Sequence, residues 1–193
     1  AAGAVAHSRP DAIKDMIKDN GDGTYTVSFK EETYYNSGRY RTRKVKVDGD
    51  LYTSGSKPLY GATTGNNSPD KMEMWFPIIE KAYASLKGNS YADIGEGGSS
   101  SQVISSMVGG RRTLQTLRDD NTESVYRRLS EATEKGWPMT ASTYGKDAEE
   151  ASRYPGTSIH AWHAYTCMGV EEEDGKRFVK LRNPWGSSEP GHD

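Results

Sequence analysis

Four stretches of the chain carry apolar residues at helical spacing. Small residues at positions 1–6 predict the end of a buried helix, and a second helix is expected to begin at Pro10 and run to residue 17. Residues 72–86 form the most apolar helical pattern, which we expect to fill a core. A last helix is predicted over 121–135, with Val125, Leu129 and Ala132 facing inward.

Five shorter stretches alternate apolar and polar residues, as half-buried strands do. Residues 24–29 predict a strand, and the basic-rich stretch 41–47 predicts its partner. Near the other end, 139–144, 160–170 and 176–182 predict three more strands. The last two are joined through an acidic segment that ends in Asp-Gly, a dipeptide typical of hairpin turns.

Glycine, serine and proline mark the connections. Residues 54–70 and 146–155 are predicted to be loops, and the Gly- and Ser-rich stretch 95–101 is predicted to be flexible backbone. Gly109-Gly110 is the best internal boundary, because the apolar pattern restarts after it.

Composition excludes several classes of protein. Val, Ile, Leu and Phe are scarce, but a net charge of −2 is too small for disorder, and 12 Tyr, 4 Trp and 6 Met add apolar volume. No run approaches the roughly 18 apolar residues of a membrane span. One cysteine excludes a disulfide framework and a multi-cysteine zinc site. Acidic and basic residues are interspersed along the sequence, so no basic cluster indicates binding of nucleic acid.

Two histidines lie in the aromatic segment 159–165. If this segment is a strand, His160 and His163 point to opposite faces, and a shared metal is not expected. Cys167 would lie about 13 Å along the same strand from His163, whereas a thiol needs its base within about 3 Å. We therefore expect Cys167 to be a buried apolar residue and not a nucleophile.

The last predicted strand ends in Asn183-Pro184-Trp185-Gly186. Pro184 stops ladder hydrogen bonding, so Asn183 stands at a strand end. Its amide could hold one nitrogen of an imidazole and leave the other nitrogen for a thiol. The alternative is a turn in which Asn183 caps its own backbone.

Five ordered motifs together resemble the core of the calpain-type cysteine proteases. They are His163-Ala164-Tyr165-Thr166 with Gly169-Val170, the segment from Lys180 to Gly186, the segment from Met74 to Ala84, the acidic strand end from Val47 to Leu51, and a linker at Tyr91–Gly98 with Gly109-Gly110. The resemblance implies a papain-like, two-lobed α+β fold with a helical first lobe over 1–108 and an antiparallel β-sheet second lobe over 109–193.

The resemblance also assigns roles to residues. It implies that His163 is the general base, that Asn183 orients it, and that Trp185 shields their hydrogen bond. The implied reaction is hydrolysis of peptide bonds through a thiolate, with protein or peptide substrates. Glu73 matches the position of a calcium ligand in the first lobe, so calcium is an expected activator, although a solvated glutamate near a helix start explains Glu73 equally well.

The chain departs from the family pattern at three places. It lacks the family's Gln-Gly-x-x-Gly-Asp-Cys-Trp segment, and the missing cysteine is expected about five residues before Ala1. Trp162 stands where the family usually has glycine, which narrows the space near the imidazole. The chain stops soon after Gly186. We therefore expect a piece truncated at both ends that cannot cleave peptides itself.

Two other functions remain open: a catalytically inactive calpain-like module that binds protein partners, and an unrelated structural domain. With no secretory signal visible and a reactive thiol implied, the cytoplasm is the expected compartment. The hairpin offers a geometric test. A two-residue Asp174-Gly175 turn without a bulge would place Asn183 opposite Thr166, whereas a longer loop centred on Glu173 would place it opposite His163.

Overall fold

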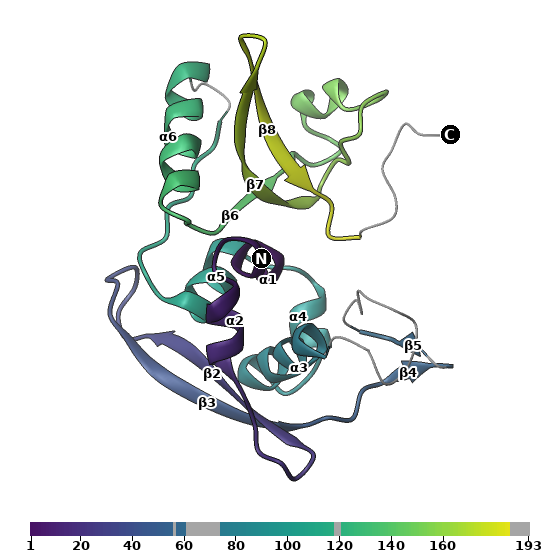
Figure 1. Cartoon of the computed structure of the whole chain (residues 1–193). Coiled ribbons are helices and arrows are strands. Elements are labelled where there is room, and N and C mark those ends of the chain that lie inside the picture. Colours follow the sequence, from purple (N-terminus) through teal and green to yellow (C-terminus); the bar gives the residue numbers. More distant parts are fainter. Residues whose placement is uncertain (56, 61–73, 118–120, 186–193) are drawn as a thin grey trace. The chain divides into compact units, whose positions relative to one another are not determined.

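The structure is a computed structural model that describes residues 1–55, 57–60, 74–117 and 121–185. It contains helices and antiparallel sheets, which confirms the α+β class (Figure 1). Contacts divide the chain into two compact units. The first unit is residues 10–112, and the second unit is residues 3–9 with the described residues from 113 onward. The lobe boundary predicted after residue 108 stays a prediction.

An antiparallel sheet of order β1-β2-β3 forms one side of the first unit. Its strands are β1 (Ile17–Asp19), β2 (Thr24–Glu32) and β3 (Tyr40–Asp48). The two long strands pair from Thr24 opposite Asp48 to Glu32 opposite Tyr40. Strand β2 begins at the predicted residue and continues three residues past the predicted end, whereas β3 is one residue longer than predicted at each end. Ile17, expected on a helix face, instead begins β1 and pairs with Val27.

Helices cover one face of this sheet, on the inner side of its curve (Figure 1). They are α2 (Pro10–Met16), α3 (Trp75–Lys87), the short α4 (Ala92–Gly95) and α5 (Ser100–Val108). Phe29 and Val27 of β2 and Ile78 of α3 are at most 1% exposed and form the centre of this core. The predicted loop 54–70 falls largely outside the described residues, apart from a hairpin of β4 (Thr53–Ser54) and β5 (Lys57–Pro58).

Helix α5 begins at Ser100, although the sequence pattern predicts flexible backbone through residue 101. The side chain of Ser99 caps the helix by accepting a hydrogen bond from the backbone N–H of Gln102. Met107 is buried, and the helix packs against β2. A good cap and an apolar face therefore outweigh the poor helix propensity of three consecutive serines.

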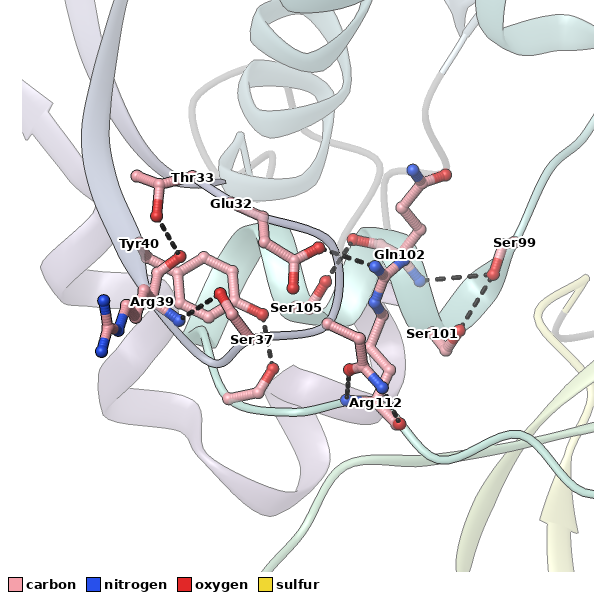
Figure 2. A network of polar contacts seen from close by, with 12 residues as sticks. Glu32, Thr33, Ser37, Arg39, Tyr40, Ser99, Ser101, Gln102, Ser105 and Arg112 are labelled. Atoms are coloured by element: carbon pink, nitrogen blue, oxygen red, sulfur yellow. Dashed lines mark hydrogen bonds and ion pairs between the residues drawn. The ribbon is translucent and has the colours of Figure 1, made fainter.

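A polar network fastens the segment after α5 to the end of the β2–β3 hairpin (Figure 2). The guanidinium of Arg112 lies 2.7 Å from the carboxylate of Glu32, and both side chains are largely buried. Asn36 accepts a hydrogen bond from the backbone N–H of Arg112 at 2.9 Å. The Tyr40 hydroxyl donates to the carbonyl of Gly110 at 2.5 Å. Because a buried charge is costly without its partner, these contacts fix where the chain leaves the first unit.

The second unit is built on an antiparallel sheet of order β6-β7-β8. Its strands are β6 (Met139–Ser142), β7 (Ala164–Glu173) and β8 (Lys176–Arg182). Helix α6 (Thr122–Glu134), capped by Asn121 as its sequence suggests, packs on β7. The predicted loop at 146–155 contains a 3₁₀ helix, η2 (Glu149–Arg153).

Helix α1 (Ala2–Ser8) is fixed to β7 at two points. A Cβ added to Gly3 would lie only 3.1 Å from Oγ1 of Thr166, so the helix approaches the strand closely there. The imidazole of His7 contacts the carbonyl of Met168 at 3.0 Å. No helix among the described residues is long and apolar enough to cross a membrane.

Phe29→Ala tests the core of the first unit. Removal of a fully buried aromatic ring leaves a cavity, so we expect the free energy of unfolding to fall by about 3–5 kcal/mol. Tyr34→Ala is the matched control, because Tyr34 is 78% exposed and a surface substitution changes stability by about 0.5 kcal/mol or less. Urea unfolding measures the free energy of unfolding of both variants. An equal fall in Phe29→Ala and Tyr34→Ala would contradict the assigned core.

Glu80 of α3 predicts a pH dependence. Burial raises the pKa of its carboxyl above the ordinary value, and no described residue donates a hydrogen bond to its buried Oε2. The folded state therefore favours the protonated form, and this group's contribution to stability is lost as pH rises through the raised pKa. We expect Glu80→Gln to raise the thermal midpoint at pH 7 and to have less effect at pH 4.

Glu131 supplies the control of opposite sign. A hydrogen bond from Lys135 lowers the pKa of its carboxyl, so its contribution is present at neutral pH and is lost in acid. Glu131→Gln should therefore lower the midpoint at pH 7 only slightly, because its ion pair with Lys135 is half-exposed. A lower midpoint for Glu80→Gln at pH 7 would refute the assignment of Glu80 as a buried, uncompensated acid.

Candidate active site

The turn before β7 holds the two histidines of the aromatic segment. Strand β7 begins at Ala164, not at residue 160 as expected. Trp162 has φ of 55°, in the left-handed region, which ends the extended backbone. The prediction that His160 and His163 point to opposite faces is therefore wrong. Their ring centroids lie 5.7 Å apart in an edge-to-face arrangement.

Thr143, which directly follows β6, fixes this turn. Its hydroxyl donates to the carbonyl of His160 at 2.8 Å and accepts from the backbone N–H of His163 at 2.9 Å. Its own backbone N–H donates to the carbonyl of His163, also at 2.9 Å. Sequence patterns could not identify this role, because it depends on two segments 20 residues apart meeting in space.

The β7–β8 hairpin determines where Asn183 lies. Asp174 and Gly175 form a two-residue turn, both with positive φ, and Glu173 pairs with Lys176. A bulge at Met168 then shifts the register, so that Thr166 pairs with Arg182. Asn183, one residue further, is thereby level with Tyr165 and not with Thr166. Because side chains alternate between faces, this shift moves Asn183 to the face that Tyr165 shares with His163.

His163 and Asn183 meet on that face. Nε2 of His163 lies 2.9 Å from Oδ1 of Asn183, whose side chain is buried. The backbone N–H of Trp185 also donates to Oδ1, at 3.1 Å. A backbone N–H is only a donor, so the atom it contacts must be the amide oxygen. Nε2 therefore carries the proton in the neutral imidazole, and Nδ1 is left as the acceptor.

Trp185 packs on the two imidazoles. Its ring centroid lies 4.4 Å from that of His163 and 4.9 Å from that of His160. The tyrosine ring of Tyr165 closes another side of His163, with centroids 4.7 Å apart. The indole itself is 58% exposed, so it forms an outer layer over the rings beneath it. The structure therefore brings the three predicted site residues, His163, Asn183 and Trp185, into one cluster.

Cys167 lies apart from this cluster. It is 4% exposed, and burial raises the pKa of its thiol above the ordinary value. With His7, Thr133 and Trp137 it lines a cavity of about 220 Å³ to which His163 and Asn183 do not contribute. A buried thiol with a raised pKa has the character of an inert structural residue.

Glu73, the predicted calcium ligand, lies outside the described residues. Within residues 1–55, 57–60, 74–117 and 121–185, no group of three or more His, Cys, Asp or Glu side chains could hold a metal ion. Calcium dependence stays a prediction.

Comparison with known proteins identifies the family. The profile of the calpain family cysteine proteases matches residues 1–191. The chain belongs to the calpain family. It is 31% identical to mouse calpain-8 over 150 residues, which cover 76% of this chain and 20% of calpain-8. It is 30% identical over 175 residues to the calpain-type cysteine protease DEK1 of Zea mays, covering 87% of this chain and 7% of the relative.

A similar match, at 32% identity over 175 residues, is to the calpain-type cysteine protease ADL1 of Oryza sativa subsp. japonica, again covering 87% of this chain and 7% of the relative. The chain thus spans a fifth or less of these relatives. The α+β architecture agrees with a calpain-type, papain-like core. The calpain resemblance drawn from the five motifs is confirmed, and so is the assignment to the thiol proteases.

The reactivity of Cys167 is directly testable. Because burial raises the thiol pKa, the thiolate fraction at pH 8 is smaller than that of a free cysteine. We expect iodoacetamide to modify Cys167 at least about tenfold more slowly than free cysteine, and at a normal rate in denaturant. Peptide mapping by mass spectrometry measures the rate. Rapid modification of the folded protein would reinstate Cys167 as a candidate nucleophile.

Proposed function

We propose that this chain forms the part of a cysteine endopeptidase that carries the general base. His163 is the base, Asn183 orients it, Trp185 shields their hydrogen bond, and the nucleophile is a cysteine about five residues before Ala1. The hydrogen bond between His163 and Asn183 is the observation that carries this proposal. It occupies Nε2 and leaves Nδ1 as the atom that can accept a thiol proton.

Burial of Asn183 adds support. Asn183 is 4% exposed and its Oδ1 accepts from two donors, so the amide cannot turn without losing both hydrogen bonds. The indole of Trp185 covers the imidazole and limits competition from water for this bond. A base whose tautomer and orientation are fixed in advance needs no reorganisation during the reaction.

Helix α1 supports the position of the thiol. From Gly3 to His7 the helix moves from the level of Thr166 to the level of Met168, so it runs parallel to β7. A further seven residues of helix before Gly3 would rise about 10 Å. Three residues of extended chain, from Thr166 back to His163, also span about 10 Å. A cysteine about five residues before Ala1 would therefore be level with His163.

The chemistry is then acyl transfer. Nδ1 of His163 accepts the thiol proton, and the thiolate sulfur bonds to the carbonyl carbon of the peptide. The C–N bond breaks as the imidazolium returns this proton to the leaving amine. Water, deprotonated by the same nitrogen, then hydrolyses the thioester and restores the thiol. Asn183 holds the ring throughout and stabilises the imidazolium form.

Labelling of the full-length protein with a peptide that bears a thiol-reactive group tests this function. We expect modification of a cysteine before Ala1, measured by peptide mapping in the presence and absence of calcium. His163→Ala should slow labelling and cleavage by about 10²–10⁴-fold. Asn183→Ala should slow them by about 10²-fold, because the imidazole then loses its fixed tautomer.

Cys167→Ala is the matched control and should leave the labelling rate unchanged, because Cys167 is buried outside the cluster. Labelling that persists at full rate in His163→Ala would contradict the assigned base. No labelling with or without calcium would refute the protease proposal and would favour an inactive binding module. Modification at Cys167 would refute the assigned nucleophile.

A further inference from the structure

Trp162 is the most unusual residue beside the proposed active site. It combines φ of 55° with a side chain that is 79% exposed, although indole is large and apolar. A bulky residue in the left-handed region is a conformational outlier. Among the described residues, no aromatic ring packs against its indole, whereas the neighbouring Trp185 contacts two imidazoles. Packing within the described fold thus gives no reason for the indole.

The backbone conformation at Trp162 is held firmly. Its N–H donates to the carbonyl of Tyr144 at 2.8 Å, and the Thr143 hydroxyl binds the backbone on both sides, at His160 and His163. Glycine would adopt this conformation without strain, whereas an indole-bearing residue does so at a cost. Strained residues that the surroundings hold in place cluster at functional sites.

The proposed reaction indicates what the indole would contact. The imidazolium of His163 donates its proton to the leaving amine, so the substrate residue that carries this amine lies beside His163 at the moment of bond cleavage. Trp162 is the adjacent residue in the chain, about 3.8 Å away between Cα atoms. The indole is therefore placed to reach the side chain of that leaving residue.

We propose that Trp162 is a specificity-determining residue of this protease, and that its indole is an apolar wall against which the side chain of the leaving residue packs. The preferred substrate is then a peptide with a bulky apolar residue, such as Leu or Phe, immediately after the scissile bond. This inference rests on the proposed function. It also limits the effect of Trp162 to acyl-enzyme formation, because the leaving residue has departed before hydrolysis.

A matched pair of substitutions in the full-length protein tests the proposal. Trp162→Gly removes both the indole and the strain, whereas Trp162→Ala removes the indole and keeps a Cβ at positive φ. In both variants we expect kcat/KM to fall about tenfold for peptides with Phe or Leu after the scissile bond, and less than twofold for peptides with Gly there. Trp137→Ala, at a half-exposed tryptophan of the same unit, should leave the ratio of kcat/KM between Phe and Gly peptides unchanged.

Stability separates this role from a structural one. Relief of the strained φ should raise the thermal midpoint of Trp162→Gly by about 2–4 °C, while Trp162→Ala stays near the parent value. A tryptophan that served the fold would instead lower the midpoint when removed. The proposal would be overturned if the ratio of kcat/KM between Phe and Gly peptides stayed unchanged in both variants, whether or not kcat/KM fell equally for all peptides.

The labelling experiment keeps this proposal distinct from the one on which it depends. An inhibitor that occupies only the substrate positions before the scissile bond does not reach Trp162. Labelling should therefore proceed at the parent rate in Trp162→Gly. Normal labelling with an unchanged ratio refutes the role of Trp162 alone, whereas absent labelling in the parent protein refutes the protease function itself.

Discussion

The bulge at Met168 is the constraint on which the candidate site depends. A two-residue turn fixes the pairing at the far end of the β7–β8 hairpin, and that register alone would carry Asn183 to the face opposite His163. One extra residue on β7 changes the parity of the strand and so reverses the face. The contact of 2.9 Å between the two side chains follows from this shift. The site is thus determined by backbone register before any side-chain chemistry acts.

A second constraint complements the first from the other end of the strand. Thr143 and Tyr144, which follow β6, bind the turn at residues 160–163 and hold Trp162 in the left-handed region. The imidazole of His163 is consequently fixed from three directions: by its own backbone, by the amide of Asn183, and by the rings around it. A general base requires such preorganisation, because motion of the ring would move its nitrogen out of line with the thiol proton that it accepts.

Much of this arrangement could be predicted from the sequence. Long alternating or helical patterns correctly gave β2, β3, β8 and α6, and the motifs around His163 and Asn183 gave the family. Helix α5 is not predicted because three consecutive serines are typical of a loop. The cap by Ser99 and the burial of Met107, which stabilise the helix, are contacts that exist only in the folded chain. The predicted start of β7 is wrong because the residue type of Trp162 does not indicate its positive φ, which ends the extended backbone there. The bulge, likewise, depends on the partner strand.

The parity of the hairpin also bears on how this part of the protein can vary during evolution. Residues added in equal number to both strands, at the Asp174-Gly175 tip, lengthen the ribbon and leave the pairing of its open end intact. A single residue gained or lost between Thr166 and the tip, on one strand only, would exchange the two faces. We therefore expect related chains to tolerate changes of hairpin length in steps of two, while odd changes are removed by selection unless a new bulge restores the register.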